Sequence, residues 1–111
     1  MNLPLFVFGT LRRGHENHHY LDGHYDTVIP ATLRDYQRVR LLMIAPQSDA
    51  RVDGELFFLK QDDYDRTMAG CDELEEIPPR QLVGHEYQRK QVSVETEQGT
   101  IQAWAYVQPE M

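Results

Sequence analysis

An unusual group of carboxylates stands near the end of a predicted helix. Residues 72–76 read Asp-Glu-Leu-Glu-Glu, and acids are disfavoured there because the C-terminus of a helix already carries partial negative charge. A carboxylate that is held among like charges and partly removed from water by an apolar face has a raised pKa. Such a group accepts a proton near neutral pH and can return it, which is the chemistry of a general acid/base.

Helical phase indicates which of these acids faces the protein interior. Glu75 follows Cys71 by four positions and Met68 by seven, so it lies on the apolar side of the helix. Glu73 and Glu76 turn more toward water. Acids are rare on a buried face, so Glu75 is the candidate general acid/base. The competing interpretation is that the whole run is a solvated acidic surface.

A glycine turn that follows a short apolar segment is the second candidate. On leaving that segment the chain reads Phe8-Gly9-Thr10-Leu11-Arg12-Arg13-Gly14. A turn of this kind can direct several backbone N–H groups into one concave spot, where they bind a carboxylate or an oxyanion. The alternative is a permissive turn with two arginines on the surface. A Walker phosphate loop is excluded because the G-x-x-x-x-G-K-[ST] pattern is missing.

Three further groups of residues have less specific patterns. A set of imidazoles and carboxylates invites a metal site, because both are common zinc and iron ligands, but its spacing matches no metal-binding signature. We therefore expect a polar loop and no metal there. Cys71 is expected to pack in the core rather than act as a catalytic thiol. Tyr87, Trp104 and Tyr106 either line a pocket or fill the faces of a sheet. The members of the imidazole and carboxylate set are His15, Glu16, His18, His19, Asp22, His24 and Asp26.

Short β-type segments and one helix must position these groups. The helix begins after Asp62 or Asp63, presents an apolar face at spacings of three and four residues, and ends before Pro78. Residues 16–26 and 45–50 read as loops, the first with one helical turn. This pattern predicts a mixed α and β domain with a mostly antiparallel sheet that can curl into a barrel. The predicted strands are 3–8, 27–33, 37–44, 52–60, 86–95 and 100–107.

Composition limits the class of protein. The 111 residues carry 11 Lys and Arg against 18 Asp and Glu, a net charge of −7, which disfavours binding to nucleic acid or an anionic membrane. The longest apolar stretch, residues 3–8, is too short to span a bilayer, and no basic segment precedes it as in a signal peptide. The single cysteine allows no internal disulfide, which fits the reducing cytoplasm. We expect one compact cytoplasmic domain over residues 1–111.

Five short motifs, in this order, resemble those of the γ-glutamylcyclotransferase-like superfamily. Any one of them is weak, but their order and spacing form a strong joint signal that covers essentially the whole chain. Residues 7–14, with Asn17 and Leu21 behind them, are similar to the family's V-[YF]-G-[ST]-L-R-x-G-x-x-N-x-x-x-L opening. The other four are residues 52–56 (V-x-G-E-L), 72–75 (the end of L-D-x-x-E), 87–89 (Y-x-R) and 103–107 (the closing strand).

The resemblance implies both a fold and a reaction. The fold is α+β, a small mixed and mostly antiparallel β-barrel with one main helix and one cavity. The reaction needs no cofactor, and it converts a γ-glutamyl amine or γ-glutamyl amino acid to 5-oxoproline and a free amine. The expected partner is therefore a small γ-glutamyl molecule, and the expected state is a monomer or weak homodimer. Glu75 would be the acid/base, and the substrate-binding residues would be Phe8, Gly9, Thr10, Leu11 and Tyr87.

The sequence also departs from the family pattern. Phe8 stands where tyrosine is usual. Glu76 stands where glycine commonly follows the catalytic glutamate, so two adjacent acids, Glu75 and Glu76, are candidates for the catalytic role. Residues 77–86 form a longer segment than expected before the Y-x-R strand, and it can act as a lid or rim. Two rival functions stay open: a non-catalytic ligand-binding or partner-binding module on the same fold, and a metal-dependent protein that uses residues 15–24.

Overall fold

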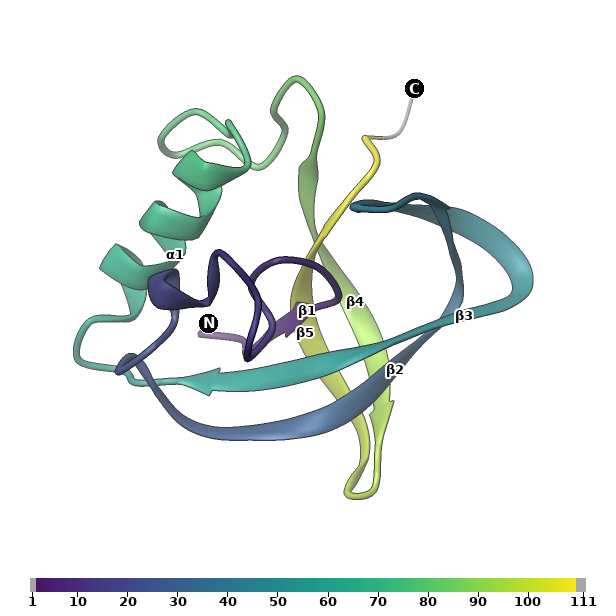
Figure 1. The fold of residues 1–111 in the computed structure, drawn as a ribbon, viewed down its shortest axis with the longest axis horizontal. Helices are drawn as coiled ribbons and strands as arrows, with labels where there is room; N and C mark the ends of the chain where they lie inside the picture. The colour runs from purple at the N-terminus through teal and green to yellow at the C-terminus, as the bar shows by residue number, and fades with distance from the viewer. Residues whose placement is uncertain (1, 110–111) are drawn as a thin grey trace.

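Five strands close into a barrel in the computed structural model, which describes residues 2–109 (Figure 1). Their order around the barrel is β1-β3-β2-β4-β5, and every pairing except that of β1 with β5 is antiparallel. The predicted α+β class, a mostly antiparallel barrel with one main helix, is thereby confirmed. The elements are β1 (Leu5–Val7), the 3₁₀ helix η1 (His18–Tyr20), β2 (Tyr25–Arg40), β3 (Met43–Leu59), α1 (Tyr64–Leu74), β4 (Gln88–Thr96) and β5 (Gly99–Val107).

Two predictions about the middle of the chain are wrong. Residues 27–33 and 37–44 were expected to form separate strands, yet β2 continues from Tyr25 to Arg40. Asp35, which lies between these two expected strands, adopts a left-handed backbone (φ 65°) at a shift in the β2–β3 register. Asp tolerates this conformation, so it produces a β-bulge that bends the strand without ending it.

The predicted loop at residues 45–50 lies within β3 (Met43–Leu59). Asp49 adopts a left-handed backbone (φ 66°), and its amide donates to the Asp35 carboxylate at 3.1 Å, so the two aspartates share one bulge. The chain reverses direction at residues 41 and 42, in the middle of the segment expected to be a single strand. A long, bent β2–β3 hairpin therefore replaces the three predicted strands 27–33, 37–44 and 52–60 and the predicted loop.

Side-chain alternation along β1 divides the core into two clusters. Phe6 belongs to a cluster with Leu56 and Val94, whereas Leu5 belongs to a second cluster with Met68 of α1. Successive strand residues point to opposite faces of a sheet, so β1 supports both clusters. Full burial of each large apolar side chain stabilises the fold by about 1.5 to 3 kcal/mol before entropy is counted. Both faces of the short β1 strand are thereby buried.

Gly54 permits a close approach between β3 and β1. A Cβ at this position would lie 2.3 Å from the carbonyl oxygen of Val7 and 2.8 Å from the Phe6 ring. Only glycine allows the two backbones this close, which accounts for the glycine of the V-x-G-E-L segment. The contact fixes the point where β1 ends and the next turn begins.

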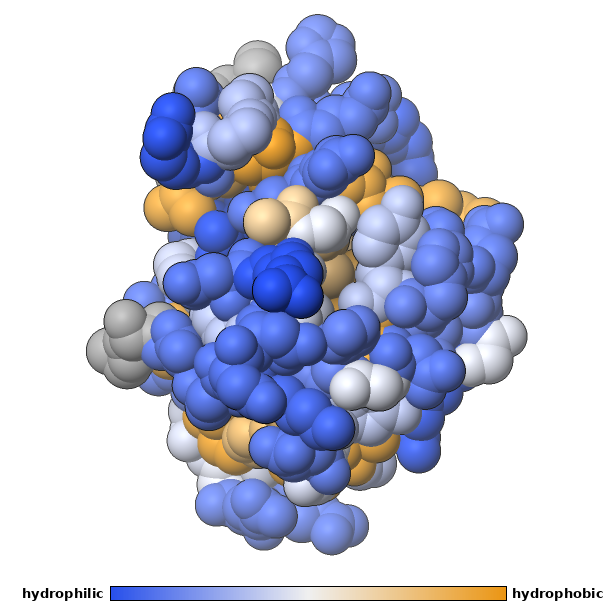
Figure 2. Space-filling model, turned by 90° about the vertical axis from the view of Figure 1, so that its left-hand side faces the viewer, coloured by the Kyte–Doolittle hydropathy of each residue, from blue (hydrophilic) through white to orange (hydrophobic). Residues whose placement is uncertain are grey.

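The helix α1 covers one side of the barrel, and Figure 2 views the molecule from that side. The face is mostly hydrophilic, with smaller apolar areas between the polar side chains (Figure 2). Tyr64, Met68 and Cys71 turn inward from α1 and are buried. None of the helices in residues 2–109 has the length and apolar character to cross a membrane.

Candidate active site

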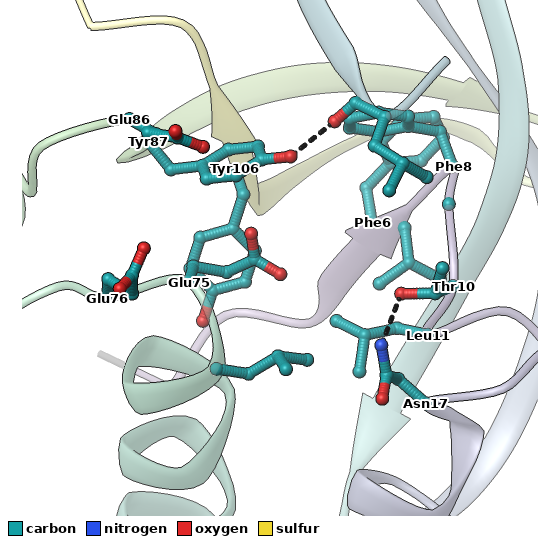
Figure 3. A pocket seen from close by; sticks show the side chains of 14 residues that line it. Phe6, Phe8, Thr10, Leu11, Asn17, Glu75, Glu76, Glu86, Tyr87 and Tyr106 are labelled. Atoms are coloured by element: carbon teal, nitrogen blue, oxygen red, sulfur yellow. Dashed lines mark hydrogen bonds between the residues drawn. The ribbon is translucent and has the colours of Figure 1, made fainter.

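A cavity of about 220 Å³ lies between the C-terminal end of α1 and the turn that follows β1 (Figure 3). This volume is below the roughly 300 to 1,000 Å³ of pockets for drug-sized ligands, so it suits a smaller molecule. The cavity brings together the acidic run and the glycine turn, which are more than sixty positions apart in sequence. Its walls are formed by Phe6, Val7, Phe8, Gly9, Thr10, Leu11, Asn17, Leu42, Leu74, Glu75, Glu76, Glu86, Tyr87 and Tyr106.

Glu75 is placed at the cavity by the way in which α1 ends. It is the C-cap residue, and its amide donates to the carbonyl of Cys71 at 3.1 Å. Glu76 follows in a left-handed backbone (φ 58°), a place that glycine usually fills, and the amide of Ile77 then donates to the carbonyl of Asp72 at 2.9 Å. This turn ends the helix abruptly. Figure 3 shows the partly buried Glu75 side chain reaching toward the wall that carries Thr10 and Leu11.

The environment of Glu75 favours its protonated form. Its pKa is raised from 4.5 to about 7, first by burial and then by the negative charges of Asp72, Glu76 and Glu86. Glu73 and Glu76 are exposed, as helical phase predicts. Glu76 nevertheless borders the cavity, so both candidate acids lie at the same site. A carboxyl group with a pKa near 7 can both take and return a proton.

The opposite wall is the turn of residues 8–11, which we call the floor turn. Asn17 holds it from behind, since its side-chain amide donates to the Thr10 hydroxyl at 2.8 Å and its backbone amide donates to the Thr10 carbonyl at 2.9 Å. Within residues 2–109 the backbone amides of Gly9, Thr10 and Leu11 donate to no protein acceptor. Unpaired amides that border a cavity are available to an anionic or carbonyl oxygen of a ligand.

Tyr87 closes one side of the cavity. Its hydroxyl donates to the backbone carbonyl of Leu42 at 2.6 Å, which joins the segment before β4 to the tip of the β2–β3 hairpin (Figure 3). Burial raises the pKa of Tyr87, and the charges of Glu75 and Glu86 act in the same direction. The phenol therefore stays protonated and can keep donating.

The other two aromatic candidates, Tyr106 and Trp104, lie in different places. Tyr106 borders the cavity, but Trp104 lies outside it, with its ring 4.6 Å from the Arg89 guanidinium carbon. Cys71 packs in the core as expected, and burial raises the pKa of its thiol to about 12, which keeps it unreactive. The sequence analysis did not identify Leu42 as a residue of the cavity, because nothing in its local sequence indicates that it lies at the tip of a hairpin. Only the folding of β2 onto β3 brings it to the cavity.

A mostly buried polar network of Asp72, Arg89 and Tyr106 lies next to the acidic run of residues 72–76. The carboxylate of Asp72 accepts from the Tyr106 hydroxyl at 2.6 Å and from Nη2 of Arg89 at 3.1 Å. Nε of Arg89 lies 3.0 Å from the other Asp72 oxygen, close enough for an ion pair but not aligned as a hydrogen bond. Because both side chains are mostly buried, the arginine is the main balance to the Asp72 charge one helical turn before Glu75.

The histidine-rich segment makes separate contacts with the rest of the fold. Nδ1 of His18 lies 2.9 Å from the Leu11 carbonyl, and His24 pairs with Asp63 at 2.6 Å. His19 stacks on Tyr20 with ring centres 4.6 Å apart. In the part of the chain that the structure describes, no three His, Cys, Asp or Glu side chains are grouped so that they could hold a metal.

Known proteins resemble this chain in sequence and in structure. A protein of Drosophila melanogaster named "Putative gamma-glutamylcyclotransferase CG2811" is 30% identical over 96% of this chain and 70% of its own length. A Vibrio cholerae protein named "Putative gamma-glutamylcyclotransferase" is 34% identical over 96% of this chain and 82% of its own length. These relatives extend over nearly all of the barrel.

Solved structures share the fold at lower identity. The crystal structure of YkqA from Bacillus subtilis superposes with a TM-score of 0.74 at 24% identity, and it covers 97% of this chain. The match spans only 36% of YkqA, so this chain corresponds to about a third of that protein. The family model described as gamma-glutamyl cyclotransferase, AIG2-like, matches residues 5–111. The chain therefore belongs to the gamma-glutamyl cyclotransferase, AIG2-like family.

Proposed function

We propose that this protein is a cofactor-independent cyclotransferase that converts a γ-glutamyl amine or γ-glutamyl amino acid to 5-oxoproline and a free amine. Family membership supports a γ-glutamylcyclotransferase-like function in general terms. The observation that carries the specific reaction is the position of Glu75, a carboxyl group with a pKa near 7, across a small cavity from unpaired backbone amides.

The acid and the amides have complementary tasks in this reaction. The α-ammonium of the substrate is not nucleophilic until it loses a proton, which Glu75 accepts. The freed nitrogen then attacks the γ-carbonyl carbon, and the amides of the floor turn stabilise the oxyanion that develops. Glu75 returns its proton to the leaving nitrogen as the amide bond breaks. The second ammonium proton leaves the new lactam nitrogen and is taken up by the released amine, so the reaction consumes no water.

The charge of the cavity also fits such a substrate. Three carboxylates, those of Glu75, Glu76 and Glu86, border it and attract the α-ammonium group. Ring closure is intramolecular, so holding the glutamyl chain in a bent conformation supplies much of the remaining rate enhancement. The walls of Phe6, Phe8 and Leu11 exclude water from the reacting carbonyl.

The direct test is the release of 5-oxoproline from a panel of γ-glutamyl amines and γ-glutamyl amino acids. We expect turnover of at least one member of the panel, measured by chromatographic detection of 5-oxoproline. If no member is turned over while one binds in the cavity, the rival function, a non-catalytic binding module on the same fold, replaces the proposal.

The pH dependence of turnover is a second prediction. Glu75 acts first as a base, so its carboxylate form must be present before the substrate binds. Its pKa of about 7 predicts that kcat/KM rises with pH and levels off above about pH 7. An acid limb near pH 4.5, the ordinary value for glutamate, would contradict this assignment. Initial rates at fixed ionic strength between pH 5 and about pH 9 measure it.

A further inference from the structure

We propose that Arg38 is a positioning residue that clamps the floor turn to the tip of the β2–β3 hairpin and strengthens the amides that bind the substrate. Arg38 lies in β2, outside every motif described above. Its role in catalysis rests on the proposed function, because it acts on the same cavity. The clamp itself consists of hydrogen bonds that can be examined without any substrate.

The guanidinium of Arg38 joins two segments that are distant in sequence. Its Nη2 donates to the Phe8 carbonyl at 2.7 Å, and its Nη1 donates to the Leu41 carbonyl at 3.0 Å. The guanidinium carbon also lies 5.3 Å from the centre of the Phe8 ring. A rigid, planar fork is suited to two acceptors at once, whereas a lysine ammonium is a single point charge.

A second arginine acts on the next peptide group of the same turn. Nε of Arg12 donates to the Gly9 carbonyl at 3.0 Å. The burial of Arg38 lowers the pKa of its guanidinium, and the charge of Arg12 lowers it further, so the two cations lie close enough to repel each other. Among the described residues neither arginine forms an ion pair with a carboxylate. Their positive charge is therefore directed at backbone carbonyls of the floor turn.

These two contacts act on the donors that border the cavity. The Phe8 carbonyl belongs to the same peptide group as the Gly9 amide, and the Gly9 carbonyl to the same group as the Thr10 amide. A charged donor on a carbonyl withdraws electron density from its peptide group and makes the N–H on the other side a stronger donor. Both amides lack a protein acceptor among residues 2–109. The arginines thus prepare them for an oxyanion or carboxylate.

The hairpin tip adds a steric part to this clamp. Leu42 borders the cavity and packs over Gly9, since a Cβ on Gly9 would lie 3.4 Å from Cδ2 of Leu42. Leu42 is also held by Tyr87, and the neighbouring Leu41 by Arg38. Removal of the Arg38 guanidinium would remove one of these two hydrogen bonds, so that Leu42 would be held less firmly over Gly9.

The substitution Arg38→Gln tests the proposal. We expect kcat/KM for 5-oxoproline release to fall by about 10- to 100-fold, as for a donor that is weakened or misplaced, with most of the loss in kcat. Arg38→Lys keeps the charge but offers one donor group, so it should recover part of the activity. Arg34→Gln is the matched control, because Arg34 lies on the same strand and pairs with Glu95 outside the cavity.

Two readouts separate the clamp from general loss of structure and from failure of the proposed function. In nuclear magnetic resonance spectra of the ligand-free protein, the Gly9 amide proton should shift upfield in Arg38→Gln and stay unchanged in Arg34→Gln. The Kd for 5-oxoproline, used as the probe, should rise about 10-fold in Arg38→Gln only.

The outcomes are distinct. If the wild-type protein turns over no γ-glutamyl compound, the proposed function fails, and the Gly9 shift alone then decides whether the clamp exists. If the wild-type protein is active but Arg38→Gln retains its kcat/KM and Gly9 shift, the inference is wrong. A loss in Arg38→Gln that Arg34→Gln reproduces also overturns it, since the effect would then follow from removing any positive charge on β2.

Discussion

Replacing Glu75 with glutamine is expected to lower kcat/KM for 5-oxoproline release by about 10² to 10⁴-fold, the usual contribution of a positioned general acid/base. Glutamine has nearly the same shape and keeps the place at the end of α1, but it cannot exchange a proton. The backbone contact from its amide to Cys71 does not depend on the side chain. The fold should therefore persist, which circular dichroism and the dispersion of amide resonances can verify.

Two neighbouring acids provide the comparison variants. Glu73 carries the same charge in the same run but is exposed and does not border the cavity, so Glu73→Gln should retain wild-type turnover. Glu76 borders the cavity, and Glu76→Gln decides between the two adjacent acids. A larger loss in Glu76→Gln than in Glu75→Gln would transfer the acid/base role to Glu76. Full activity in both Glu75→Gln and Glu76→Gln would contradict the mechanism.

The substitution Glu75→Gln should also stabilise the protein at alkaline pH. Because the pKa of Glu75 is raised from 4.5 to about 7 in the folded state, its protonated form is favoured there, and the free energy of unfolding falls as pH rises through this window. Above pH 7 the buried charge costs roughly 2 to 3 kcal/mol, which Glu75→Gln would recover. Urea denaturation of both proteins at pH 8 and pH 5 should show the difference only at the higher pH. Loss of activity with gain of stability distinguishes a functional acid from a structural one.

Helical phase was sufficient to predict the inward position of Glu75, because α1 is regular up to the residue before it. Met68 and Cys71 face the core, and the next position on that side is the C-cap. The local sequence could also anticipate that Glu73 stays in water. It could not reveal the left-handed turn at Glu76, because glutamate has no preference for that conformation. The residue that follows this turn, Ile77, is buried.

The part of the cavity wall that the β2–β3 hairpin forms could not be predicted from the sequence, for a different reason. Asp35 usually signals a turn, and here it forms a bulge because the pairing of β2 with β3 continues past it. Leu42 then reaches the cavity through a contact with Tyr87 that joins positions 45 residues apart. Arg38 depends on the same long-range closure. Periodicity reports on one segment at a time, so contacts that are created by barrel closure leave no local pattern.

The ion pair between Arg89 and Asp72 is expected to control both stability and the protonation of Glu75. Replacing Arg89 with methionine leaves the Asp72 carboxylate mostly buried and without its arginine, while the Tyr106 hydroxyl still donates to it. Breaking a buried pair in this way costs about 3 to 5 kcal/mol in the free energy of unfolding. The exposed pair of Arg34 with Glu95 provides the control, because Arg34→Gln should cost less than about 1 kcal/mol.

The effect on Glu75 follows from the charges that face it. Asp72, Glu76 and Glu86 already raise its pKa, and without Arg89 the Asp72 charge is no longer balanced. The pKa of Glu75 should rise further, so the acid limb of the pH–rate profile should move to higher pH in Arg89→Met. Adding Asp72→Asn removes the unbalanced charge and should return the limb to or below its wild-type position, while asparagine can still accept from Tyr106. An acid limb that stays in place in Arg89→Met, in a protein shown to be folded, would mean that Arg89 only holds the barrel wall. A limb that moves and is then reversed by Asp72→Asn would show that the charge behind the helix end sets the proton affinity of the acid in front of it.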